Sequence, residues 1–315
     1  MAERLVWDQE VPGSRPGAPI LIFMRKRATA AVPGGKNRRV LAFSKYHALG
    51  NDYIVIAPSR WSSPLTPELI RTLCERNTGV GADGILLGPC PGHKLPFVRV
   101  FNSDGSEAAR SGNGLRIFAR FLHDNGFVSN NKFTVESACG QTPVELLPSG
   151  LVKADMGLPD FHSSAVPMRG PEREAVGEML IIDGRAFSVT CLSVGIPACV
   201  ALCGAISPEL ARQYGPRIEK HALFPEKTNV QFARVSGPDS LEIEIWERGS
   251  GYTLASGSSA CAAAASAWKT GLMEGNSLTV QMRGGSVTVT RDSNGRLGLC
   301  GPVSPVFSGE LTYTP

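Results

Sequence analysis

The chain has 315 residues, with 32 basic and 28 acidic side chains. The small formal charge of +4 argues against a surface dedicated to nucleic acid, and no apolar stretch reaches the ~20 residues of a membrane-spanning helix. A hydrophobic content of 42% with 19% charged residues indicates a globular chain with a real core, and the length favours about two domains.

The first 39 residues are expected to be a flexible N-terminal extension. Basic residues are concentrated between Arg25 and Arg39, without an acidic neighbour and around Pro33-Gly34-Gly35. A solvated arm is therefore favoured over a targeting or nucleic-acid-binding segment. The eight cysteines are spread thinly, which predicts reduced thiols and a cytoplasmic location.

From Val40 onward the sequence pattern is typical of short strands and few helices. Strands are predicted over residues 40–47, 50–56, 84–87 and 97–102, and a helix over residues 67–76 behind an N-cap at Thr66. Residues 79–84 match a dinucleotide-binding fingerprint by letter. We exclude a Rossmann site, because an apolar strand-like run follows where a helix should begin.

Two distant segments resemble each other. Ser111-Gly112-Asn113-Gly114 and Ser256-Gly257-Ser258-Ser259 each open an apolar helical pattern, about half the chain length apart. This repeat predicts two similar half-chains, each with strands around one buried helix. The two helix starts are then expected to face each other across a cleft.

Such helix starts can bind an anion. The first four N–H groups of a helix lack internal acceptors, and the helix dipole adds positive potential. Glycine and serine let a carboxylate or phosphate approach the backbone closely. The other interpretation, that Ser111 and Ser256 are ordinary N-caps, stays open.

A polar loop precedes each of these helices, over residues 101–107 and 246–252. Glu247 and Arg248 are adjacent in the second loop and could bind the ammonium and carboxylate groups of a zwitterion. A solvated surface pair is the alternative interpretation.

Several motifs together resemble one family in the correct order. They are Gly50-Asn51-Asp52-Tyr53, Asn102-Ser103-Asp104-Gly105-Ser106-Glu107, Gly112-Asn113-Gly114, Thr228-Asn229-Val230, Glu247-Arg248-Gly249 and Gly257-Ser258-Ser259-Ala260-Cys261. From about Val40 to the C-terminus the sequence resembles the diaminopimelate epimerase family.

The resemblance implies an α+β fold of two pseudo-symmetric halves, each a β-barrel around a central α-helix. The first half is expected over residues 40–157, joined by a C-terminal strand at about 302–315, and the second over residues 158–301. The implied chemistry is cofactor-independent and metal-free racemisation of an amino acid between the halves. A homodimer is an open expectation, and neither nucleic acid nor a membrane is an expected partner.

The family's two catalytic cysteines correspond to Ser111 and Ser256 in this sequence. The resemblance assigns substrate binding to Asn51, Asn102, Gly112, Asn113, Asn229, Glu247, Arg248, Gly257 and Ser258. A thiol titrates near ~8.5, whereas an alkyl hydroxyl is a far weaker acid and needs a neighbouring base. Because acid–base participation is worth ~10² to 10⁴ in rate, we expect this chain to be inactive or to trap its substrate.

Three explanations of the paired serines stay open. Both cysteines could have been exchanged deliberately so that substrate is held without turnover. The chain could instead be a natural relative that runs another reaction, such as isomerisation or dehydration. A paralogue that only binds an amino acid is the third explanation.

A second departure concerns the substrate. Where the family has Gly-Asn-Pro-His, this chain has Gly195-Ile196-Pro197-Ala198. Loss of a hydrogen-bonding partner weakens discrimination by a large factor. The substrate is therefore expected to be a polar amino acid, either diaminopimelate or another such as histidine, with Tyr252 as an aromatic wall.

The remaining cysteines are interpreted as structural. Cys261 lies five residues along its helix from Ser256 and points away from it, so we expect it in the core. The same expectation is made for Cys74, Cys90, Cys139, Cys199 and Cys203.

Overall fold

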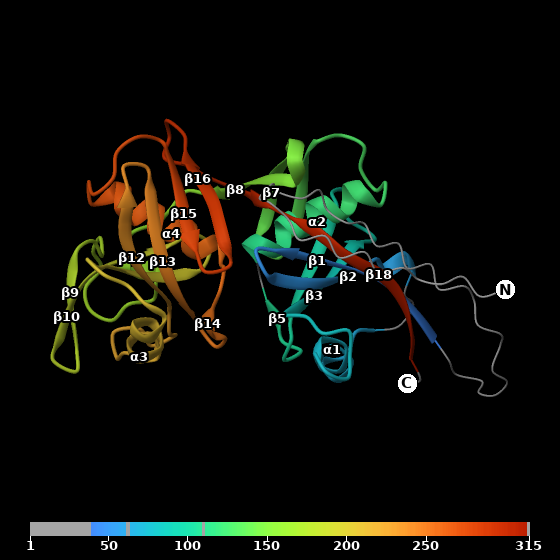
Figure 1. Ribbon diagram of the computed structural model, residues 1–315, viewed down its shortest axis with the longest axis horizontal. Helices are drawn as coiled ribbons and strands as arrows, with labels where there is room; N and C mark the ends of the chain where they lie inside the picture. Colours follow the sequence, from blue (N-terminus) through green and yellow to red (C-terminus); the bar gives the residue numbers. More distant parts are fainter. Residues whose placement is uncertain (1–38, 61–63, 109–110, 314–315) are drawn as a thin grey trace, which may run out of the picture. The chain divides into compact units, whose positions relative to one another are not determined.

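The structure is a computed structural model that describes residues 39–60, 64–108 and 111–313 (Figure 1). The expected N-terminal extension lies outside these residues except for Arg39, where the first strand begins. The α-helices are α1 (Pro67–Cys74), α2 (Gly112–Asp124), α3 (Pro208–Glu219) and α4 (Gly257–Lys269). Short 3-10 turns occupy Pro58–Arg60, Pro148–Gly150 and Ser163–Ala165.

Strands make up most of the rest of the described chain. Those of the first part are β1 (Arg39–Ala48), β2 (Asn51–Ile56), β3 (Gly84–Cys90), β4 (Phe97–Asn102), β5 (Glu107–Ala108), β6 (Lys132–Ser137), β7 (Gly140–Leu146) and β8 (Leu151–Gly157). They are followed by β9 (Glu178–Ile182), β10 (Arg185–Ser193), β11 (Pro197–Leu202), β12 (Asn229–Gly237), β13 (Ser240–Glu247), β14 (Gly251–Thr253), β15 (Ser277–Met282), β16 (Gly285–Arg291), β17 (Leu297–Pro302) and β18 (Ser304–Tyr313).

The strand pairing repeats along the chain. From β1 the neighbours are β2 (antiparallel), β3 (parallel), β4 (antiparallel), β6 (parallel), β7 and β8 (both antiparallel). From β10 the same order recurs through β11, β12, β13, β15, β16 and β17. The repeat confirms the predicted fold of two pseudo-symmetric halves.

The helices occupy equivalent places in this repeat. Helix α1 lies between β2 and β3 in sequence, and α3 lies between β11 and β12. Helices α2 and α4 follow the short strands β5 and β14. The halves are joined where β8 pairs antiparallel with β17, from Gly157 opposite Leu297 to Leu151 opposite Pro302. The C-terminal β18 returns to the first half and pairs with β1 (Figure 1).

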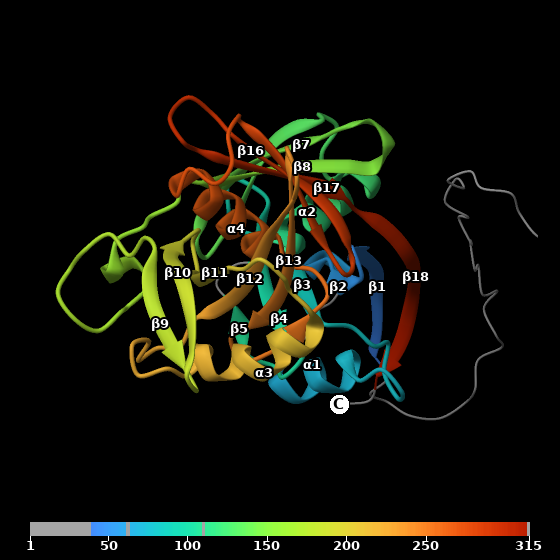
Figure 2. The same cartoon turned by 60° about the vertical axis from the view of Figure 1, so that its left-hand side comes forward.

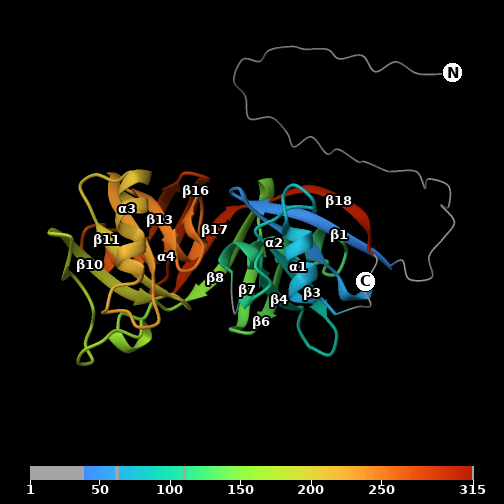
Figure 3. The ribbon, with the colours of Figure 1, turned by 90° about the horizontal axis from the view of Figure 1, so that it is seen from below.

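Each central helix lies inside its own set of strands (Figures 2 and 3). Helix α2 contacts β1, β2, β3, β7 and β8, and it fills its half with large side chains such as Phe118 and Phe121. Helix α4 contacts β10–β13 and β15–β17 and is buried on nearly all sides. Its run of alanines makes this possible, because short side chains let strands pack close to the helix on every face.

Local predictions from the sequence agree with this structure. The turn between β1 and β2 has positive φ at Leu49 (55°) and Gly50 (87°), as a two-residue hairpin requires. Thr66 caps α1 by accepting from the Leu69 N–H at 3.3 Å. The helix ends at Cys74 because Glu75 is extended. The run after residue 83 is the strand β3, which confirms the exclusion of a Rossmann site.

One prediction about cysteine burial was wrong. Cys74, Cys199 and Cys261 are buried as expected, and Cys90 and Cys203 are half-buried. Cys139 is exposed, because it lies in the turn between the paired strands β6 and β7. No helix in the described part of the chain is long and apolar enough to cross a membrane.

Candidate active site

Ser111 and Ser256 are the N-caps of α2 and α4. Both residues have extended backbone angles, and the Ser111 hydroxyl accepts the Gly114 N–H at 3.0 Å. The Ser256 hydroxyl accepts the Ser259 N–H at 3.4 Å. The capping interpretation from the sequence is therefore correct.

The two helix starts meet at their glycines. A Cβ atom placed on Gly112 would lie 3.6 Å from the Ser258 nitrogen and 3.7 Å from the Gly257 Cα. A Cβ on Gly257 would lie only 2.5 Å from the Leu299 side chain. A side chain at Gly257 would therefore clash with Leu299, whereas a Cβ on Gly112 would already be in van der Waals contact with the start of α4.

Several backbone N–H groups without an acceptor among the described residues lie where the two helix starts meet. Within the described residues, the N–H groups of Gly112, Asn113, Gly257 and Ser258 have no acceptor. We call these four N–H groups the amide cradle. Two helix dipoles direct positive potential toward it, so the arrangement can hold a carboxylate or another small anion.

Tyr53 lies beside the first of the two serines. Its hydroxyl is 3.0 Å from the Ser111 Oγ, and the residue is buried at the start of β2. Burial raises the pKa of Tyr53 to about 12, a hydrogen bond with Ser111 lowers it in part, and the nearby negative charge of Glu247 raises it further. The phenol therefore keeps its proton at neutral pH.

Glu247 lies beside the second serine, at the end of β13. The residue as a whole is partly exposed, but its carboxyl group is closely surrounded by protein atoms. This loss of solvation raises the pKa of Glu247, and the nearby Ser256 hydroxyl lowers it only in part. Ser256 itself is 4% exposed, and its hydroxyl is also 3.2 Å from the Ser258 Oγ.

Replacement of Glu247 by glutamine should stabilise the protein at neutral and alkaline pH. Because the pKa of Glu247 is raised in the folded state, the ionised carboxylate destabilises that state above the folded pKa. The penalty disappears as pH falls toward the unfolded value of ~4.3. Thermal unfolding at pH 8, 6.5 and 5 should show a gain for Glu247→Gln that shrinks with pH. Glu242→Gln, which breaks an outer pair with Arg234, should show no such gain.

Two asparagines lie within one hydrogen-bonded chain at the amide cradle. The Asn51 Nδ2 donates to Asp83 at 2.8 Å, and the Asn113 Nδ2 donates to the Asn51 Oδ1 at 3.1 Å. The Asn113 Nδ2 also lies 3.4 Å from the backbone oxygen of Ala255, which precedes the N-cap of α4. Asn113 therefore links the two halves directly.

Charged groups hold the turn that carries Asn51. Asp52 forms ion pairs with Lys45 at 2.9 Å and with Arg76 at 3.0 Å. Burial opposes ionisation of Asp52, but hydrogen bonds from Arg76 and Lys45 outweigh it and lower the pKa of the carboxyl group. Asp52 thus stays ionised and fixes the start of β2.

Asn102 lies at the end of β4, and its side chain bonds within its own turn. Its Nδ2 donates to the Ser106 Oγ at 2.9 Å, and the residue is exposed. Its strand neighbour is Gly84, whose backbone packs against the Tyr53 ring. Asn102 therefore lies close to the Tyr53 ring and makes no described hydrogen bond to either serine.

Asn229 and Arg248 form part of the second half's loops. The buried Asn229 side chain donates to the Pro197 backbone oxygen at 2.8 Å and accepts the Arg248 N–H at 2.9 Å. The exposed Arg248 side chain reaches the Glu226 backbone oxygen at 3.1 Å. Asn229 thus ties the loop that contains Ile196 to the turn after β13. Glu247 and Arg248 make no ion pair with each other among the described residues.

The expected aromatic wall at Tyr252 is not formed there. Tyr252 is opposite Trp246 in the β13–β14 pair, whereas Glu247 is opposite Gly251. Because neighbouring residues of a strand point to opposite faces, Tyr252 faces away from Glu247. Its hydroxyl donates to Glu244 at 2.6 Å, and Arg212 stacks on its ring.

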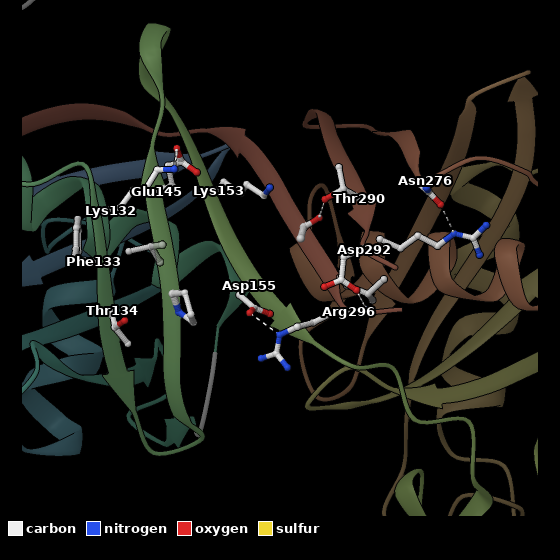
Figure 4. Close-up of a pocket in the computed structure, with 15 residues that line it drawn as sticks. Lys132, Phe133, Thr134, Glu145, Lys153, Asp155, Asn276, Thr290, Asp292 and Arg296 are labelled. Carbon is white, nitrogen blue, oxygen red and sulfur yellow. Dashed lines mark hydrogen bonds and ion pairs between the residues drawn. The ribbon is translucent and has the colours of Figure 1, made fainter. Parts of the chain in front are cut away.

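One cavity of the structure lies away from these residues. It has a volume of about 770 Å³ and lies between β6–β8 and β15–β17, with Lys132, Lys153, Asp155 and Arg296 among its lining residues (Figure 4). None of the site residues expected from the sequence lines it. A second cavity of about 540 Å³ includes Asp83 and so borders the chain of asparagines.

Sequence reasoning missed three residues of this site, Tyr53, Asp83 and Arg116. Tyr53 belongs to a motif that was recognised, but only its asparagine was assigned a role. Arg116 is fully buried in α2 and donates to the Asn113 Oδ1 at 2.6 Å. An arginine within the apolar run Leu115 to Phe118, three residues after Asn113, is the signal that could have revealed it. No group of three possible metal ligands occurs in the described ranges.

Comparisons with known proteins agree with this architecture. The family model described as diaminopimelate epimerase matches residues 43–162 and 190–305. Diaminopimelate epimerase 2 of Nostoc sp. is 45% identical over 274 residues, which cover 86% of this chain and 96% of that protein. Diaminopimelate epimerase of Synechocystis sp. is 38% identical and covers 86% of this chain and 98% of its own.

Solved structures with low sequence identity share the fold. A probable proline racemase from Agrobacterium radiobacter superposes with a TM-score of 0.64 at 13% identity, over 86% of this chain and 92% of that one. A predicted epimerase from Pseudomonas aeruginosa gives 0.63 at 17% identity, over 86% and 99%. The matched family model, the relatives in sequence and the paired half-chains together show that this chain belongs to the diaminopimelate epimerase family.

Proposed function

We propose that this chain binds the zwitterionic end of a polar amino acid between the starts of α2 and α4, without the cofactor-free racemisation that cysteines at the same positions would allow. The observation that carries the proposal is the meeting of Gly112 and Gly257, which places four free N–H groups together. The α-carboxylate would accept from this amide cradle. Ser111 and Ser256 would flank the α-carbon from its two sides.

The serines limit the reaction rather than the binding. In the two-base mechanism, a base on one face takes the α-proton while an acid on the other face delivers a proton to carbon. The charge that moves into the carboxylate would be stabilised by the amide cradle. Ser111 lies next to the protonated Tyr53, and no described hydrogen bond joins its hydroxyl to a base, so the face at Ser111 is not expected to start this exchange.

The distal part of the site supports an amino acid other than diaminopimelate. Ile196 stands where the family has asparagine, and the nearby Asn229 amide is engaged by Pro197 and Arg248. Neither side chain is then available to bind a second amino-acid end. A single polar group of the ligand, such as an imidazole or an amine, would be left to Glu247.

Calorimetric titration of the unaltered chain tests this proposal. Histidine, lysine, arginine and meso-diaminopimelate should be compared at the same pH and salt concentration. We expect at least one of the three single-ended amino acids to bind as tightly as diaminopimelate or more tightly. Tight binding of diaminopimelate alone would reject the substrate assignment, and no binding of any amino acid would reject the site.

A second candidate function is favoured by one observation. Glu247 gives Ser256 the neighbouring base that a hydroxyl needs, and loss of solvation raises the pKa of its carboxyl group, which makes it a stronger base. A carboxylate on one face could move a proton within an activated acid, as in isomerisation of a double bond. Turnover of such a substrate by the unaltered chain, lost in Glu247→Gln, would favour this function over binding alone.

A further inference from the structure

Arg116 is the most unusual charged residue of the core. It lies in α2, is 0% exposed, and is the largest fully buried side chain of the described protein. Its Nε and Nη1 atoms have no hydrogen-bond partner, and no carboxylate within the described ranges pairs with it. An unpaired buried cation is costly, so its presence requires a compensating role.

The one described hydrogen-bond partner of the Arg116 side chain is Asn113. The Arg116 Nη2 donates to the Asn113 Oδ1 at 2.6 Å. That oxygen also lies 3.4 Å from the point where a Cβ would stand on Gly257. The guanidinium group is therefore linked to the first turns of α2 and α4 through the side chain of Asn113.

The hydrogen-bond chain has a fixed direction. Asp83 can only accept, so it takes the Asn51 amide nitrogen, and the Asn51 oxygen then faces Asn113. Arg116 can only donate, so it takes the Asn113 oxygen. Asp83 and Arg116 at the two ends of the chain thus fix which atom of each asparagine side-chain amide is the oxygen and which the nitrogen.

We propose that Arg116 is a positioning residue that orients Asn113 and whose unpaired charge makes a carboxylate the preferred occupant of the amide cradle. This inference rests on the proposed function, since it needs an anion at that place. Attraction between charges is strong where water is excluded, so an incoming carboxylate would supply a counter-charge that no described carboxylate gives Arg116. Burial lowers the pKa of Arg116 to about 10, which leaves the side chain charged at neutral pH.

The test uses acetate as a bare carboxylate and acetamide as its neutral counterpart, with sodium chloride holding the ionic strength constant. In the unaltered chain, thermal unfolding should shift upward with acetate and far less with acetamide. Arg116→Met should weaken the response to acetate about tenfold in concentration, with little change for acetamide. Arg120→Met is the matched control, because Arg120 lies one turn further along α2 and pairs with Asp124. Its response should equal that of the unaltered chain.

A merely structural role predicts that Arg116→Met is less stable than the unaltered chain and that its response to acetate is unchanged. The proposal predicts a different pattern. Arg116→Met should be at least as stable as the unaltered chain without ligand, because it removes a buried unpaired charge. An unchanged acetate response in Arg116→Met overturns the proposal, and so does an equal loss in Arg120→Met or the lack of any acetate preference in the unaltered chain. If Arg116→Met does not fold, Arg116→Lys replaces it in the test. This variant keeps the charge without the planar group and should keep most of the acetate preference. Loss of that preference in a folded Arg116→Lys also overturns the proposal.

The amino-acid proposal and this one can fail separately. An acetate preference that depends on Arg116, together with no binding of any amino acid in calorimetry, would leave the anion site and reject the amino-acid ligand. Amino-acid binding that is unaffected by Arg116→Met would keep the amino-acid ligand and reject the role of Arg116.

Discussion

Cysteine at both positions 111 and 256 should enable α-proton exchange. We expect Ser111→Cys/Ser256→Cys to incorporate solvent deuterium at the α-carbon of its amino acid about 10²- to 10⁴-fold faster than the unaltered chain. The reason is the acidity of the thiol, which titrates near ~8.5, and the electropositive helix starts lower that value further. Mass spectrometry of each amino acid in the calorimetry panel after incubation in D₂O measures the exchange.

The two single variants should differ from each other. A thiol at position 256 would lie beside the Glu247 carboxyl group, which can take its proton. A thiol at position 111 would lie beside Tyr53, whose pKa of about 12 keeps the phenol protonated. Ser256→Cys alone should therefore exchange one enantiomer faster than Ser111→Cys exchanges the other. A folded double variant that exchanges no amino acid would contradict the racemase interpretation of the site.

Phe118→Ala should be among the most destabilising single changes in this chain. Phe118 is fully buried in α2 and packs against Phe121 and the backbone of Gly88. Removal of such a ring leaves a cavity that strands cannot collapse to fill, at a cost of about 3–5 kcal/mol in the free energy of unfolding. Urea unfolding followed by circular dichroism measures this loss.

Phe127 provides the comparison. It lies just beyond the same helix, contacts Phe121 with ring centroids 5.7 Å apart, and is 38% exposed. Phe127→Ala should cost about 1 kcal/mol or less. If Phe118→Ala proved no more destabilising than Phe127→Ala, α2 would not be the centre of its half.

Features that depend on neighbouring residues were predictable from the sequence. The serine caps at 111 and 256, the turn at Gly50 and the strands on either side of it follow from backbone preferences and side-chain periodicity. The repeated helix starts also indicated two half-chains, and the strand order bears this out. The boundary between residues 157 and 158 stays a prediction.

Orientation within the site depended on distant parts of the chain. The sequence placed Glu247 and Arg248 side by side as one polar pair, but β13 turns Glu247 toward Ser256 while Arg248 bonds to the Glu226 backbone. Tyr252 faces away from Glu247 because neighbouring residues of a strand point to opposite faces. The exposure of Cys139 is likewise a consequence of a hairpin turn that the pattern of cysteines could not reveal.

The sequence alone therefore determined the family and the paired helix starts, and it has serine at positions 111 and 256, where the resemblance implies cysteine. Only the tertiary structure brought Asp83, Asn51, Asn113 and Arg116 into one directed chain of hydrogen bonds. A hydrogen bond needs two atoms within about 3 Å, and folding of the first half brings Asp83 and Asn51 that close to the start of α2. The meeting of α2 with α4 then fixes what the free amides of both helices can bind.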